Sequence, residues 1–188
     1  MVKVDDGKHP EFPGPSFWHF RKNRKAFRRF AAELVVQNPI LSQLPLIGHD
    51  LDKAQMLGFR DIFTSSSSAW CTQHIKGRDA EQLRVLGTKM HDSSRILSDI
   101  YGTQSDILLQ NGLADAYDDD DFNTKLTSLE EIWNSISPGF HKWFVKNRSQ
   151  MFLDCLTFTA RRNLNIQERY YTNGLEIKHK LQKKKISE

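Results

Sequence analysis

Long apolar runs and cysteines are both scarce in this sequence of 188 residues. No run approaches the ~20 apolar residues needed to span a bilayer, and no charged-then-apolar leader opens the chain. The two cysteines, Cys71 and Cys155, could form at most one bridge. Without a secretory leader we expect thiols rather than a disulfide at these positions. Together these absences predict an intracellular protein that is neither secreted nor bound to a membrane.

The composition is sufficient for a folded core. Hydrophobic residues make up 38% of the chain and aromatic residues 11%, which argues against a disordered protein. A chain of this length can form one sizeable core, whereas two full domains would be cramped.

Positive charge is gathered into clusters, although the net charge is only +4. Such clusters suit a phosphate-binding surface, because each phosphate contact releases counterions. A solvated helix face or a nuclear-import signal would have the same composition. Negative charge is pooled at residues 118–121, which we interpret as a solvated loop and helix N-terminus. The basic clusters comprise Arg21, Lys22, Arg24, Lys25, Arg28 and Arg29, then Arg161 and Arg162, and finally the lysines of 178–185, among them Lys178 and Lys180.

A strand, a carboxylate and a helix follow one another in the first third of the chain. Residues 44–50 predict a short apolar strand that ends at Asp50, and a helical pattern begins at about Asp52. In an open α/β sheet the ligand crevice lies beyond the carboxyl ends of the strands, which favours a functional Asp50. The alternative is that Asp50 or Asp52 only caps the following helix.

The remaining pattern is mostly helical. Apolar spacing predicts helices over residues 23–38, 52–63 and 72–86, with Gly87 as a C-cap and a short edge strand at 69–71. Residues 87–166 look mainly helical. There we expect a stretch through Ile96, Ile100 and residues 107–109 that Gly102 interrupts, one helix over 122–136, Pro138 in the first turn of the next, and another helix over 151–162.

Cys71 and His74 have the spacing of a metal-ligand pair. A structural zinc site normally has four ligands, and no second Cys/His pair with ordinary spacing is present. His91, His141 and His179 could complete a site, but nothing in the sequence requires it. We therefore do not expect zinc, and interpret the pair as a buried cysteine and a hydrogen-bonded histidine.

Four motifs resemble those of the Mutator-like branch of the DDE transposases, and their order and spacing along the chain support the resemblance. Residues 48–54, Gly-His-Asp-Leu-Asp-Lys-Ala, resemble the segment of the second catalytic aspartate, with His49 and Asp52 where the family often has Thr and Glu. Cys71 and His74 resemble a recurring Cys-x-x-His pair that is taken as structural. The other motifs are a linker at residues 9–15 and an Asn-x-x-Glu pattern at 173–176 that follows Tyr-Thr and opens a helix.

The resemblance implies an α/β, mostly helical chain with a partial ribonuclease-H-like core that an all-helical insertion interrupts. Residues 1–15 would be an entry loop and 16–86 the first part of the core. Residues 87–166 would form the insertion, and 167–188 the final catalytic-type helix.

The resemblance also implies two-metal phosphodiester chemistry. Asp50 and Glu176 would be catalytic carboxylates that bind Mg²⁺ or Mn²⁺, which prefer hard oxygen ligands. Without the resemblance, Glu176 reads as a capping-box glutamate in the first turn of a basic helix. The family's first catalytic aspartate precedes the segment that residues 9–15 resemble, and neither Asp5 nor Asp6 fits that role. We therefore expect an incomplete DDE triad and no independent cleavage, so the enzymatic status stays open.

DNA is the partner that this interpretation implies, through Arg21, Lys22, Arg24, Lys25, Arg28, Lys178 and Lys180. A nuclear location follows, and a homodimer is a further option. The alternative is a binding module for nucleic acid or protein that was domesticated from a transposase and lacks catalysis.

Overall fold

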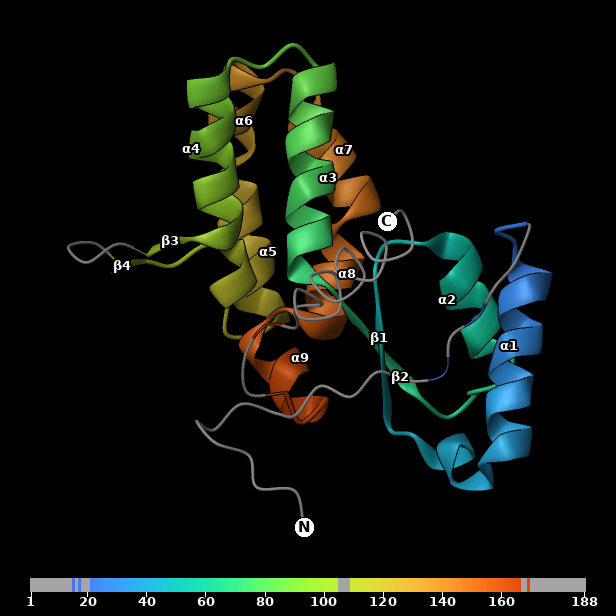
Figure 1. Ribbon diagram of the computed structural model, residues 1–188. Coiled ribbons are helices and arrows are strands. Elements are labelled where there is room, and N and C mark those ends of the chain that lie inside the picture. Colours follow the sequence, from blue (N-terminus) through green and yellow to red (C-terminus); the bar gives the residue numbers. More distant parts are fainter. Residues whose placement is uncertain (1–14, 16, 18–20, 105–108, 167–168, 170–188) are drawn as a thin grey trace. The chain divides into compact units, whose positions relative to one another are not determined.

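The computed structural model describes residues 15, 17, 21–104, 109–166 and 169 (Figure 1). The chain divides into two compact units. The first comprises Met1–Leu44, Asp52–Ser65 and Thr172–Glu188, and the second comprises Pro45–Leu51 and Ser66–Tyr171. In the described part of the chain, no helix combines the length and the apolar character that crossing a membrane requires.

The first unit contains helices α1 (Arg24–Gln37) and α2 (Lys53–Arg60) and the 3₁₀ turn η2 (Pro39–Gln43). The predicted helix over 23–38 is confirmed, because Asn23 caps α1 by accepting a hydrogen bond from the Ala26 N–H at 3.0 Å. Gly58 lets the two helices approach closely: a Cβ there would lie 2.7 Å from the Phe27 Cβ and 2.8 Å from the Arg24 carbonyl oxygen.

Two parallel strands open the second unit, β1 (Leu46–His49) and β2 (Ser67–Trp70). Leu46 pairs with Ser67 and His49 with Trp70, so both strands end at the same edge. The predicted strand over 44–50 is therefore present. The expected edge strand at 69–71 begins two residues earlier and ends at Trp70.

Helices make up most of the second unit, as the sequence predicts (Figure 1). Leu86 is the C-cap of α3, and the predicted Gly87 follows it with φ at +73°; the N–H groups of Gly87 and Thr88 donate to the carbonyls of Arg84 and Leu83, which ends the helix one residue before the predicted cap. The elements are α3 (Thr72–Val85), α4 (Met90–Tyr101), the antiparallel pair β3 (Thr103–Gln104) and β4 (Leu109–Gln110), η3 (Leu113–Asp115), α5 (Asp119–Ser128), α6 (Glu130–Ile136), α7 (Phe140–Asn147), α8 (Ser149–Cys155) and α9 (Phe158–Asn163).

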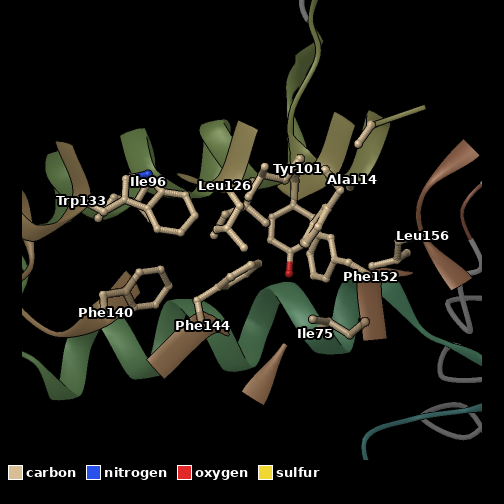
Figure 2. Packing of buried hydrophobic residues seen from close by; sticks show 14 of the residues in the cluster. Ile75, Ile96, Tyr101, Ala114, Leu126, Trp133, Phe140, Phe144, Phe152 and Leu156 are labelled. Carbon is tan, nitrogen blue, oxygen red and sulfur yellow. The ribbon is translucent and has the colours of Figure 1, made fainter. Parts of the chain in front are cut away.

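The core of this unit is built from aromatic side chains on successive helices (Figure 2). Trp133 meets Phe144 edge to face at 5.4 Å, and Phe144 meets Phe152 in the same way at 5.3 Å. Such pairs contribute roughly 0.5–1.5 kcal/mol beyond the area they bury. Phe140 and Phe144 are thus fully buried in this core.

Several expected helices also differ from the structure. Leu109 lies in β4 and not in a helix. The helix expected over 122–136 is two helices, α5 and α6, because the Leu129 N–H is shared between the carbonyls of Lys125 (3.2 Å) and Leu126 (3.3 Å), which tightens and ends α5. The apolar spacing continues across the break because Phe122 and Trp133 face the same core.

The helix expected over 151–162 is also divided, into α8 and α9. The Phe158 N–H donates to the Ala116 carbonyl at 2.9 Å, and Thr157 caps α9. Because these backbone groups are engaged elsewhere, the helix cannot continue through them. Pro138 precedes α7 instead of lying in its first turn, and Gly139 forms the N-cap with φ at +86°.

The fold class is thus confirmed at its coarser level, a mostly helical α/β chain with a small parallel sheet.

Candidate functional site

Asp50 lies at the carboxyl end of β1, as the sequence predicts. It follows directly after His49, which is buried and packs against Trp70 with ring centroids 5.5 Å apart. On the neighbouring strand the Cys71 N–H donates to the His49 carbonyl at 2.8 Å. Asp50 and Cys71 therefore come directly after two paired strands, at the edge where α/β proteins bind ligands.

The structure also decides which aspartate caps α2. Asp52 is the N-cap and accepts a hydrogen bond from the Gln55 N–H at 3.0 Å. It also pairs with Lys22 at 2.5 Å. Burial raises the pKa of Asp52, but the hydrogen bonds from Lys22 and the Gln55 N–H outweigh it and hold the pKa below its usual value. Capping thus occupies Asp52, and α2 does not need Asp50 as its cap.

Cys71 and His74 lie at the start of α3. Cys71 is fully buried at the N-cap position, and His74 is partly exposed in the first turn. Of the histidines that could complete a zinc site, His141 donates through Nε2 to the Leu126 carbonyl at 3.1 Å, and His91 lies exposed beside Asp92. Among the residues that the structure describes, no three His, Cys, Asp or Glu side chains are grouped so that they could hold a metal ion. The structural role of Cys71 and His74 stays a prediction.

Several predicted residues lie outside the described part of the chain. These are Glu176, Lys178, Lys180, His179 and almost all of the linker at 9–15. The structure therefore does not place the second carboxylate of the expected metal site.

Ion pairs engage two of the predicted DNA-binding residues on the first unit. The Nε and Nη2 groups of Arg24 donate to the Asp61 carboxylate at 2.8 and 2.6 Å, and Lys22 pairs with Asp52. The hydrogen bond from Arg24 holds the pKa of Asp61 below its usual value. Arg21, Lys25, Arg28 and Arg29 are exposed. We call Lys25, Arg28 and Arg29 the α1 basic face.

A buried polar triad joins Asp79, Tyr101 and Arg148, and sequence reasoning missed it. The Tyr101 hydroxyl and the Arg148 Nε each donate to the Asp79 carboxylate at 2.6 Å. Asp79 is fully buried, and burial raises its pKa although Arg148 opposes the shift. Burial and the neighbouring Asp79 raise the pKa of Tyr101 well above its usual value. Figure 2 shows the Tyr101 oxygen directed towards α3.

No nearby sequence motif could have revealed this triad, because its members come from α3, α4 and the junction of α7 and α8. The Tyr101 and Arg148 donors and the Asp79 carboxylate satisfy one another's hydrogen bonds, which is the arrangement of a structural ion pair. We therefore assign the triad to the core.

Comparison of the chain with family models, curated proteins and solved structures gives no match in any of the three. The Mutator-like assignment therefore depends on the sequence motifs, and the roles of Asp50 and Glu176 depend on that assignment.

Proposed function

We propose that this chain derives from a DDE transposase of the Mutator-like type and that Asp50 is a metal-binding carboxylate. The observation that supports the proposal is the position of Asp50 directly after β1 of a parallel strand pair. The helix cap that would have explained an aspartate here belongs to Asp52. A ribonuclease-H-like core, of which β1 and β2 would be two strands, is part of the same proposal.

The donor chemistry of the strand edge fits a hard divalent cation. Asp50 supplies carboxylate oxygen, and Mg²⁺ in phosphoryl-transfer sites is held by one or two carboxylates together with waters and substrate phosphate. Glu176 would be the second carboxylate. Bound Mg²⁺ or Mn²⁺ would supply Lewis acidity to the phosphodiester.

The contribution of the chain itself would be positional. Asp50 is held by the β1–β2 ladder, and the bond from the Cys71 N–H to the His49 carbonyl continues that ladder to the residue before Asp50. No residue of this chain is assigned to the first carboxylate of the family. We therefore propose metal binding through Asp50 and assign no cleavage activity to the chain.

Titration with Mn²⁺, followed by the loss of its free electron paramagnetic resonance signal, tests the role of Asp50. We expect Asp50→Asn to weaken Mn²⁺ binding by about tenfold, since one of very few charged ligands is lost. Asp52→Asn is the matched control, because asparagine is an equally good N-cap and the position is two residues away. Equal affinity of the Asp50→Asn variant and the wild type would contradict the proposal.

A second candidate function, nucleic-acid binding without catalysis, is favoured by the α1 basic face. Lys25, Arg28 and Arg29 are exposed on one helix, and Arg21 precedes it. Because the ion pair with Asp61 anchors Arg24, reversing Arg24 would disturb the fold as well as the charge.

Duplex DNA binding tests this candidate. A Lys25→Glu, Arg29→Glu double variant should lose most of the affinity for duplex DNA, and the affinity of the wild type should fall steeply with salt. Lys142→Glu with Lys146→Glu, on α7, changes the charge by the same amount and should have little effect. Affinity that is insensitive to salt, or equal loss in both variants, would argue against the α1 basic face.

A further inference from the structure

A pocket of about 300 Å³ lies against α9 in the second unit. Its volume is at the lower end of the range for small-molecule sites. One aromatic ring, two guanidinium groups and a side-chain amide contribute to the wall. The lining residues are Phe158, Arg161, Arg162, Asn165 and Ile166.

Arg161 carries a donor that the described part of the chain leaves unsatisfied. Its Nε is buried and has no hydrogen-bond partner there. Buried polar atoms are paired in the great majority of cases, so this unpaired N–H marks Arg161 as a guanidinium group whose hydrogen bonds are incomplete, while the rest of the side chain is partly exposed. The planar fork of arginine matches phosphate oxygens in a bidentate manner.

The end of α9 fixes the shape of the pocket. Asn165 adopts a left-handed conformation with φ at +55°. Its N–H donates to the Arg162 carbonyl at 3.0 Å, and the Ile166 N–H donates to the Arg161 carbonyl at 2.8 Å. This is the hydrogen-bond pattern of a Schellman C-cap, and it holds Asn165 and Ile166 close to the backbone of both arginines.

The Phe158 ring of the pocket wall is stacked on the ring of Tyr117. Tyr117 and Phe158 lie 5.4 Å apart with an interplanar angle of 17°, and they are 57% and 45% exposed. The Phe158 N–H is anchored to the Ala116 carbonyl, and the Thr159 N–H to the Tyr117 carbonyl at 3.0 Å. The pair is thus held rigidly while it exposes aromatic surface to solvent.

We propose that the α9 pocket binds one nucleotide unit of a single-stranded nucleic acid. Arg161 and Arg162 hold the phosphate, and the base stacks on the face of the Phe158 ring that Tyr117 does not cover. Exposed aromatic rings beside cationic side chains are the combination by which single strands are bound without sequence preference. The acidic residues 118–121 follow Tyr117 and repel phosphate from that side, so the phosphate lies over the arginines. The site shares no residue with Asp50 or with the α1 basic face.

Fluorescence anisotropy with a labelled oligothymidylate of about ten nucleotides tests the proposal on the full chain, since this length lies within the range that single-strand sites cover. We expect Arg161→Gln and Phe158→Leu each to weaken binding by about tenfold, the size expected for loss of a phosphate contact or of one stacked base. Arg95→Gln, an exposed arginine on α4, is the matched control and should bind as the wild type does. Equal affinity of the Arg161→Gln and Arg95→Gln variants would overturn the proposal.

A measurement on the wild type keeps the test valid if a variant fails to fold. Titration with thymidine monophosphate should shift the NMR signals of the Arg161 Nε–H and the Asn165 side-chain amide, and inorganic phosphate should shift them less. No shift with either ligand would overturn the site. Equal shifts with both would overturn the stacked base.

Discussion

Among single side chains, those of the buried triad should have the largest effect on stability. Asp79→Ala would leave the Arg148 guanidinium, whose side chain is only 12% exposed, without its carboxylate. Breaking a buried pair in this way costs about 3–5 kcal/mol of stability. Urea unfolding followed by tryptophan fluorescence measures the loss, because Trp133 and Trp143 lie in this unit.

Asp79→Asn is the control for that experiment. It keeps an oxygen that can accept the Tyr101 hydroxyl, so it should lose less stability than Asp79→Ala. If both variants unfold as the wild type does, the triad is not a structural ion pair.

The Cys155 thiol predicts how stability changes at alkaline pH. Its Sγ–H donates to the Met151 carbonyl at 3.2 Å, and burial raises its pKa from about 9 to about 11. Between these values the folded state retains a proton that the unfolded state releases, so stability is full below pH 9 and is lost as the pH rises towards 11. The loss is at most about 3 kcal/mol.

Urea unfolding of the wild type and of Cys155→Ala is compared across this pH range. The difference isolates the contribution of the thiol to the free energy of unfolding. Lysine and tyrosine titrations are common to both proteins, so the variant should show the shallower decline. Parallel declines would mean that Cys155 ionises normally in the folded state.

Among the helices, the contact between α1 and α2 depends on Gly58. A Cβ there would meet the Arg24 carbonyl oxygen and the Arg28 nitrogen at 2.8 Å, and neither backbone atom can move aside without shifting α1. We expect Gly58→Ala to destabilise the first unit by about 1–3 kcal/mol. Hydrogen exchange of the α1 amides measures this.

Gly77 is the opposite case. It lies within α3, and no atom comes within 4 Å of a Cβ built there. Gly77→Ala should therefore stabilise its helix by about 0.5–1 kcal/mol. For Gly58→Ala, unchanged protection of the α1 amides against hydrogen exchange would show that α1 and α2 tolerate a wider separation.

The elements show what a sequence can and cannot determine. The apolar stripe of α1 is a local feature, and the bounds of the helix were predicted to within one residue. The division between α8 and α9 was not predictable, because it depends on a bond from Phe158 to the distant carbonyl of Ala116. Apolar spacing across Leu129 could not reveal two helices, since both face one core.

The candidate site, too, was predictable from the sequence only in part. Asp50 at a strand end was predictable from an apolar run followed by an acid, whereas the choice between Asp50 and Asp52 as the cap required coordinates. Basic clusters were visible in the sequence, but the engagement of Arg24 by Asp61 across 37 residues was not. Long-range pairing, more than local propensity, is what the sequence alone left undetermined.

At the scale of the whole molecule, the two units differ in how much they bury. In the described part of the first unit, the buried apolar side chains are Ala31 and Phe63. The second unit contains a continuous cluster that runs from Ile75 to Leu156 and includes Trp133 and three phenylalanines on α7 and α8. Because apolar burial dominates local stability, the first unit should open at a lower free energy than the second.

Native-state hydrogen exchange at increasing low concentrations of urea tests this difference. Amides of α1 and α2 should exchange through a common opening that costs less than the opening of α3, α4 and α7. Gly58→Ala should lower the first opening energy and leave the second unchanged, and Gly77→Ala should affect only the second. A single opening energy for all these helices, moved equally by both variants, would mean that the chain unfolds as one cooperative unit. The position of Asp50, which follows β1 in the second unit, would then depend on the whole chain and not on that unit alone.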